Sequence, residues 1–138
     1  MKRVLFVCVH NAGRSQMAEA LLNRLAAERD LATRAESAGT VGGKALNLAA
    51  VEVMKEIGID MSGQHPKLIS PAQVDAADLI ISMGCGVDAV ACPAKFLLTE
   101  DWNLEDPAGQ PIEQVRRIRD QLKLRVAQLL DSLEVVGL

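Results

Sequence analysis

An apolar segment near the start of the chain ends in a cysteine-containing polar loop, and a helical pattern follows directly. Arg3 to Val9 reads as an almost entirely apolar run, which suits a strand buried on both faces, as in parallel α/β sheets. From about Ser15 to Arg29 the apolar residues recur at helical spacing. This order of strand, tight loop and helix predicts an α/β fold. The loop is expected at the carboxyl edge of the sheet, where such folds bind ligands.

The loop places five residues between a cysteine and an arginine, and a serine follows: Cys8, Val9, His10, Asn11, Ala12, Gly13, Arg14 and Ser15. Five intervening residues let the backbone curl so that successive N–H groups point inwards, and the amino terminus of the next helix adds partial positive charge. Arg14 can then bind two oxygens of one anion. The same field stabilises a thiolate at Cys8, with Ser15 as helix cap and as a hydroxyl near the sulfur. The loop is predicted to bind an oxyanion above a nucleophile. The alternative is a buried cysteine with a chance arginine.

Strand and helix patterns alternate through the rest of the chain. Further strands are predicted at 33–37, 79–83 and 95–98, and helices at about 48–57 and 112–133, with a short helix before the third strand. Asn47 is a possible N-cap, and Ser70 and Gln73 have capping-box spacing. With 138 residues, we expect a single domain over 1–138 with a doubly wound α/β architecture.

Charge and cysteine content limit the possible partners and compartment. The formal net charge is −3 and the basic residues form no run, so neither nucleic acid nor an acidic membrane surface is expected as a partner. We expect no signal peptide and no membrane span. The three cysteines are then better explained as reactive thiols than as a disulfide framework, which places the chain in the cytoplasm.

An aspartate–proline pair follows the last predicted strand. Asp106 and Pro107 can return to the sheet edge that carries Cys8, where a carboxyl group could serve as general acid for a leaving oxygen. The pair is also a common turn, so its functional interpretation depends on the other residues of the site.

The remaining cysteines, Cys85 and Cys92, lie seven residues apart between Gly84, Gly86 and Pro93. C-x6-C is not the usual spacing of zinc ligands. In a helix their Cα atoms would be roughly 10 Å apart, whereas a disulfide needs about 4.4–6.8 Å. The flanking glycines and proline make unwinding easier. The segment is therefore predicted to switch between two redox forms; two buried core cysteines are the alternative.

Taken together, these motifs resemble the thioredoxin-coupled arsenate reductases, which share the low-molecular-weight tyrosine phosphatase fold. The resemblance covers nearly the whole chain. It rests on the Cys8 loop, Arg14 to Glu19, Ser37 to Gly39, the pair Cys85 and Cys92, Trp102, and Asp106 to Gly109. It implies a four-stranded parallel sheet flanked by helices.

The resemblance also implies a role for each thiol. Cys8 would attack the arsenic of an arsenate held by Arg14 and the loop N–H groups, while Asp106 protonates the departing hydroxyl. Cys85 would then attack the Cys8 sulfur and release arsenite. Cys92 would next attack Cys85, and thioredoxin would reduce the resulting Cys85–Cys92 disulfide. No metal or organic cofactor is implied, and we expect a monomer.

Two positions differ from the pattern of many relatives. His10 stands where many have glycine, and histidine tolerates a positive φ less well. Some relatives bind a monovalent cation through residues matching Asn11 and Glu19 with a hydroxyl and a carboxylate, which here are His65 and Lys67. We therefore expect no cation site, with the Lys67 ammonium reaching Glu19 and Asn11.

Two other functions remain open. A tyrosine phosphatase of the same fold would use the same loop, but the chain has no tyrosine and one tryptophan, and Ala108 follows Asp106-Pro107 where phosphatases usually place tyrosine. A phosphatase also has no use for Cys85 and Cys92. A redox-sensing or anion-binding module would need no turnover.

Overall fold

A parallel sheet forms the centre of the protein. The computed structural model describes residues 2–41, 45–83, 100–102 and 104–136. Their strands are β1 (Arg3–Cys8), β2 (Arg34–Gly39), β3 (Leu79–Ser82) and the short β4 (Glu100–Asp101). The sheet order is β2-β1-β3-β4, and every neighbouring pair is parallel. The central position of β1 places its last residue, Cys8, at the carboxyl edge of the sheet beside Gly39 of β2.

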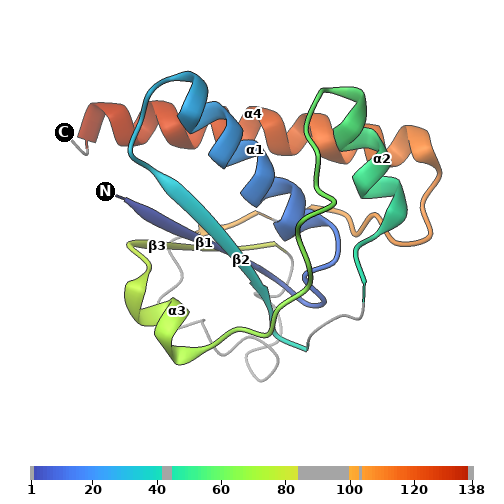
Figure 1. Ribbon diagram of the computed structural model, residues 1–138, viewed down its shortest axis with the longest axis horizontal. Coiled ribbons are helices and arrows are strands. Elements are labelled where there is room, and N and C mark those ends of the chain that lie inside the picture. Colours follow the sequence, from blue (N-terminus) through green and yellow to red (C-terminus); the bar gives the residue numbers. More distant parts are fainter. Residues whose placement is uncertain (1, 42–44, 84–99, 103, 137–138) are drawn as a thin grey trace.

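Helices cover both faces of this sheet (Figure 1). The helices α1 (Arg14–Glu28), α2 (Leu48–Glu56) and α4 (Ile112–Val136) pack on one face, and the short α3 (Pro71–Ala76) lies on the other. Successive side chains of β1 alternate between the two cores, because strand side chains have a period of two. Phe6 and Cys8 therefore belong to the large core, and Leu5 and Val7 to the small one.

The large core extends from the sheet to α4. Val115, Ile118, Leu122 and Val126 of α4 are fully buried or nearly so, at the helical spacing that places side chains on one face. Beneath them the rings of Phe6 and Trp102 have centroids 5.5 Å apart. This packing fixes β1, and hence the position of Cys8, against the longest helix of the described chain.

The predicted α/β fold, with a parallel sheet flanked by helices, is confirmed. Asn47 accepts a hydrogen bond from the N–H of Ala50, and Ser70 and Gln73 form the predicted capping box. The bounds shift by a few residues: β2 continues to Gly39 and α4 to Val136. The strand predicted at 95–98 lies outside the described residues.

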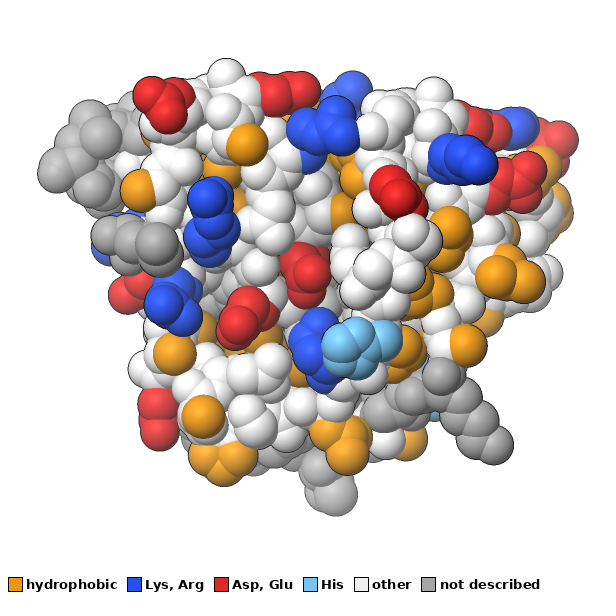
Figure 2. All heavy atoms as spheres, in the orientation of Figure 1, with side chains coloured by type: hydrophobic (Ala, Val, Ile, Leu, Met, Phe, Trp, Pro, Cys, Tyr) orange, Lys and Arg blue, Asp and Glu red, His pale blue; other side chains and the backbone are white. Residues whose placement is uncertain are grey.

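The surface carries both signs of charge. On the face drawn in Figure 2, acidic and basic side chains alternate, without one large area of a single sign. Among the described residues, no helix combines the length and the apolar character needed to cross a membrane.

Candidate functional site

Cys8 is a buried thiol with two hydrogen-bonding neighbours from the loop that follows it. Its Sγ lies 2.7 Å from Ser15 Oγ, and the Asn11 N–H donates to Sγ over 3.2 Å. Only 3% of the residue is exposed. The loop and the start of α1 therefore both contact the Cys8 sulfur.

Asn11 shapes the loop from its inside. Its φ is 55°, in the left-handed region that asparagine adopts more readily than most residues. The buried side chain donates from Nδ2 to Ser15 Oγ over 2.7 Å, and Oδ1 accepts from the backbone N–H of Lys67 over 2.9 Å. The positive φ of the loop therefore falls on Asn11 rather than on His10.

A buried glutamine, which the sequence motifs did not single out, supports Asn11. Gln16 Nε2 lies 3.0 Å from Asn11 O, 2.9 Å from Asn11 Oδ1 and 2.8 Å from His65 O. Gln64 in turn donates to Gln16 Oε1 over 2.6 Å. These bonds tie the loop to a segment nearly fifty residues away, so Gln16 is a positioning residue for the left-handed turn at Asn11.

Ser15 does not cap α1. The helix begins at Arg14, and its N-cap is Gly13, which makes no side-chain cap. Ser15 is the second helical residue, which turns its hydroxyl towards Cys8. The prediction that Ser15 caps the helix was therefore wrong, whereas its predicted place beside the sulfur is confirmed.

Arg14 is buried, with 10% of its side chain exposed. Its Nη1 donates to the carbonyl of Leu104 over 2.8 Å, and Nη2 lies 3.9 Å from Asp106 Oδ2. A guanidinium has five N–H donors, and among the described residues this carbonyl accepts the single hydrogen bond of the group.

Asp106 lies at the mouth of the site, with 54% of its side chain exposed. Its Oδ1 accepts from the N–H of Ala108 over 3.0 Å, a local turn that orients the carboxylate. Glycine at position 13 permits this approach, because a Cβ there would lie 2.6 Å from Pro107 Cγ. The loop after the last strand thus contacts the start of α1, and Asp106 can reach an anion above Cys8.

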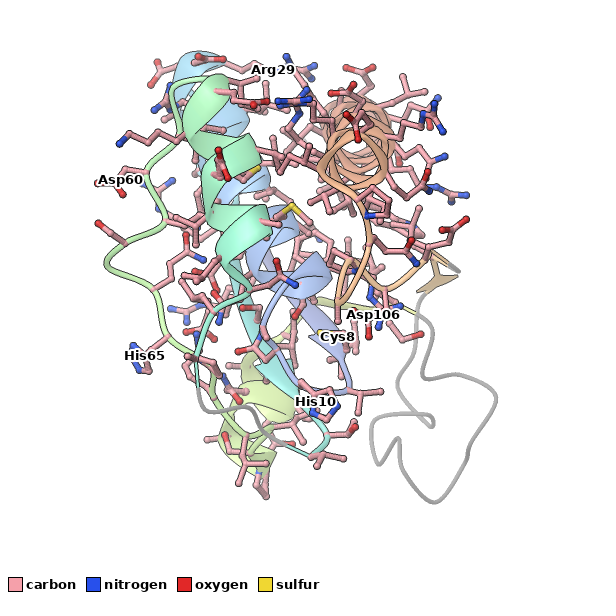
Figure 3. All side chains as sticks on the ribbon, turned by 90° about the vertical axis from the view of Figure 1, so that its right-hand side faces the viewer. Cys8, His10, Arg29, Asp60, His65 and Asp106 are labelled. Carbon is pink, nitrogen blue, oxygen red and sulfur yellow. The ribbon has the colours of Figure 1, made fainter. Side chains whose placement is uncertain are left out.

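These groups surround one small cavity of about 60 Å³. Figure 3 shows Cys8 and Asp106 close together at the carboxyl edge of the sheet, with His10 beyond them. The lining residues are Cys8, His10, Ala12, Gly13, Arg14, Asn47, Asp106 and Ala108. The structure therefore brings a thiol and a guanidinium from one loop together with a carboxylate from a distant part of the chain. Among the described residues, the lining includes no Phe, Tyr or Trp.

Lys67 lies behind the loop and makes part of the predicted contact. Its Nζ is 3.7 Å from Glu19 Oε1, which also accepts a 2.7 Å hydrogen bond from Ser37 Oγ. Asn11 is reached by the backbone N–H of Lys67, not by its ammonium. His65 is exposed on another side of the molecule (Figure 3).

Cys85 and Cys92 lie outside the described residues. Their predicted redox exchange with Cys8 therefore stays a prediction from the sequence.

A comparison with known families gives the fold a name. Residues 3–136 match the family described as low molecular weight phosphotyrosine protein phosphatase. The chain belongs to this family. Solved members include a low molecular weight protein tyrosine phosphatase from T. tengcongensis, 29% identical with a TM-score of 0.86, matching 96% of this chain and 100% of the other.

Several relatives within the low-molecular-weight phosphatase family are described as arsenate reductases. A putative arsenate reductase from Halobacterium salinarum is 41% identical, over 92% of this chain and 89% of its own length. A glutaredoxin arsenate reductase from Synechocystis is 40% identical, over 94% and 97%. A structure of an arsenate reductase in the phosphate binding state is 39% identical, with a TM-score of 0.82 and coverage of 96% and 98%. Because this family holds phosphatases as well as reductases, the reaction must be argued from the site.

Proposed function

We propose that the chain reduces arsenate to arsenite, with Cys8 as nucleophile and a disulfide passed through Cys85 to Cys92. The observation that carries the proposal is the shared cavity of Cys8, Arg14 and Asp106. The two later cysteines of the sequence and the arsenate reductases among the relatives favour reduction over hydrolysis.

In the first step the Cys8 thiolate attacks arsenic and an arsenic–oxygen bond breaks. Arg14 binds the oxygens together with backbone N–H groups of residues 9–15, where the helix amino terminus adds positive charge. Asp106 supplies a proton, so that the departing oxygen leaves as water. The product is a covalent bond between Cys8 Sγ and arsenic.

In the second step the Cys85 thiolate attacks Cys8 Sγ. The sulfur–arsenic bond breaks, and its electron pair goes to arsenic, which passes from the +5 to the +3 state and leaves as arsenite. Cys92 then attacks the Cys8–Cys85 disulfide at Cys85 and releases the Cys8 thiolate. Reduced thioredoxin regenerates both thiols by exchange with the Cys85–Cys92 disulfide.

All three cysteines must be thiols before each turnover. A reducing compartment keeps them so, and we therefore place the enzyme in the cytoplasm. The reductant is a separate question, because one of the relatives is described as a glutaredoxin arsenate reductase.

The test is arsenate-dependent NADPH oxidation by the purified chain. We expect turnover with thioredoxin and its reductase, to be compared with glutaredoxin plus glutathione and with a mycothiol system. Cys8→Ser should abolish turnover with every reductant while leaving the melting temperature near that of the wild type. Undiminished turnover in Cys8→Ser would overturn the proposal, whereas turnover with glutaredoxin alone would change only the reductant.

A tyrosine phosphatase is the second candidate, because phosphate and arsenate have nearly the same shape and charge and solved phosphatases share the fold. The described lining of the cavity offers no Phe, Tyr or Trp side chain to an aryl ester. We therefore expect kcat/KM for p-nitrophenyl phosphate to lie far below that for arsenate.

A further inference from the structure

Asn47 connects the start of α2 to the Cys8 loop. Its backbone N–H donates to the carbonyl of Ala12 over 2.8 Å. The same residue is the N-cap of α2 and lines the cavity that contains Cys8 and Arg14. Asn47, which lies outside the loop, therefore both caps α2 and lines the cavity.

The orientation of the Asn47 amide is fixed by its role as a cap. Its Oδ1 accepts a 2.9 Å hydrogen bond from the N–H of Ala50. Since the oxygen is engaged by α2, the remaining polar atom is the donor Nδ2. Within the described part of the chain, Nδ2 makes no hydrogen bond.

The Asn47 side chain begins close to the loop. Asn47 is half-buried, and its Cβ lies 3.8 Å from the point where a Cβ on Gly13 would be. A Cβ on residue 13 would collide with Pro107 and would lie in ordinary van der Waals contact with Asn47. Asn47 therefore lies beside the part of the loop where Gly13 lines the same cavity.

We infer that Asn47 Nδ2 is a substrate ligand, donating a hydrogen bond to an oxygen of the oxyanion held above Cys8. The inference rests on the proposed function, because both place a tetrahedral oxyanion in this cavity. Arg14, at the start of α1, and Asn47, at the start of α2, would each bind an oxygen of the anion. Two such contacts fix the direction from which the Cys8 sulfur approaches arsenic. As a neutral donor, Asn47 adds a directed bond without a second positive charge.

The inference can be tested by separating the two roles of Asn47. Asn47→Ser keeps a good N-cap and removes the amide donor, while Asn47→Asp keeps both the cap and the shape and replaces the donor by an acceptor. The probe is inorganic phosphate, titrated calorimetrically into the reduced protein, because it resembles arsenate but does not oxidise thiols. A hydrogen bond to a charged partner corresponds to about a 10- to 100-fold change in affinity. We expect a rise in Kd of about tenfold for Asn47→Ser and more for Asn47→Asp, with melting temperatures near that of the wild type.

Gln110→Glu is the control for charge. Gln110 is exposed in the same loop as Asp106 but does not line the cavity, so the variant adds one negative charge near the site and leaves Asn47 intact. Its Kd for phosphate should change less than twofold. A Kd for Asn47→Ser within twofold of the wild type would reduce Asn47 to a helix cap and overturn the inference. If Gln110→Glu raised the Kd for phosphate as much as Asn47→Asp, the effect of Asn47→Asp would be assigned to charge alone. The inference would then fail unless Asn47→Ser also weakens phosphate binding.

These measurements do not depend on arsenate turnover. If the wild type fails to reduce arsenate but Asn47→Ser still weakens phosphate binding, the proposed function fails and the ligand role of Asn47 stands. If arsenate turnover occurs and both Asn47 variants bind phosphate as the wild type does, the proposed function stands and the ligand role of Asn47 fails.

Discussion

Two arginines of this protein are almost equally buried but have very different partners. Arg14 begins α1 and exposes 10% of its side chain, and Arg119 lies in α4 and exposes 11%. Arg119 donates over 2.8–2.9 Å to the carbonyl of Val53 and to the carboxylates of Glu56 and Asp120. Among the described residues Arg14 donates to one carbonyl, and its carboxylate neighbour is 3.9 Å away and largely exposed.

The difference separates a structural cation from one that is ready for a ligand. A buried charge costs free energy unless paired, and the partners of Arg119 meet that need within the fold. Arg14 has no comparably close carboxylate among the described residues, and it lines a cavity with a thiol in its floor. Under the proposed function, a bound oxyanion would be the partner of this guanidinium.

The first prediction concerns Asp106, the carboxylate near Arg14. If its role is to donate a proton, Asp106→Asn should lower kcat by about 10²–10⁴, the contribution of a positioned acid, and leave the melting temperature unchanged. The measurement is steady-state arsenite production across pH. If Asp106 served only as a counter-ion for Arg14, asparagine would preserve the rate, and the contrast between the two arginines would weaken.

The second prediction exchanges both arginines for lysine. Arg14→Lys keeps the charge but loses the planar set of donors, and kcat/KM should fall by about 10²–10³, as when a preorganised donor to an anion is removed. Arg119→Lys should leave kcat/KM unchanged and lower the free energy of unfolding by about 1–3 kcal/mol through its lost buried hydrogen bonds. Both variants are measured by denaturant unfolding and by steady-state kinetics. A loss of kcat/KM in Arg119→Lys together with an unchanged kcat/KM in Arg14→Lys would contradict the roles given to the two arginines.

The third prediction addresses the surroundings of the sulfur. Ser15→Ala removes the hydroxyl 2.7 Å from Cys8 Sγ, so iodoacetamide should alkylate Cys8 about tenfold more slowly at neutral pH, the lower end for a hydrogen bond to a charged group. Ser37→Ala is the matched control, since its buried hydroxyl bonds Glu19 instead. Peptide mass spectrometry follows Cys8 separately from the other cysteines. Equal rates in the two variants would exclude a role for Ser15 in activating the thiol.

The smallest predicted effect concerns the pH dependence of stability near Arg119. The hydrogen bond from Arg116, with another from Arg119, holds the pKa of Glu56 below its usual value, against an opposing effect of desolvation. A carboxyl group whose pKa is lower in the folded state stabilises the fold above its unfolded pKa of about 4.3 and loses this contribution as pH falls through the folded value. The difference in unfolding free energy between wild type and Glu56→Gln should therefore shrink between about pH 5 and pH 3. A constant difference would show that the ion pair contributes nothing.

Local patterns in the sequence predicted much of the fold and which residues of the Cys8 loop lie together. The C-x5-R spacing identified Cys8 and Arg14 because a strand, a tight loop and a helix impose short-range geometry. The capping box of Ser70 and Gln73 was confirmed for the same reason, since its reciprocal hydrogen bonds join residues three positions apart.

Contacts between distant segments left no comparable signal. The bond from Gln16 to His65 spans 49 residues, and that from Arg14 to Leu104 spans 90. The prediction that Ser15 caps α1 was wrong because the helix starts at Arg14, after the left-handed turn at Asn11. The serine hydroxyl then contacts the Cys8 sulfur rather than a backbone N–H.

The central claim, that arsenate is reduced through an ordered exchange among three thiols, is tested most directly by one turnover of Cys92→Ser. The variant is reduced, freed of reductant and mixed with excess arsenate; arsenite is counted per enzyme, and disulfides are mapped by mass spectrometry after alkylation. We predict about one arsenite per chain and a Cys8–Cys85 disulfide, with Cys85→Ser releasing little or none. Sustained thioredoxin-driven turnover by Cys92→Ser, or full activity of Cys85→Ser, would contradict the account.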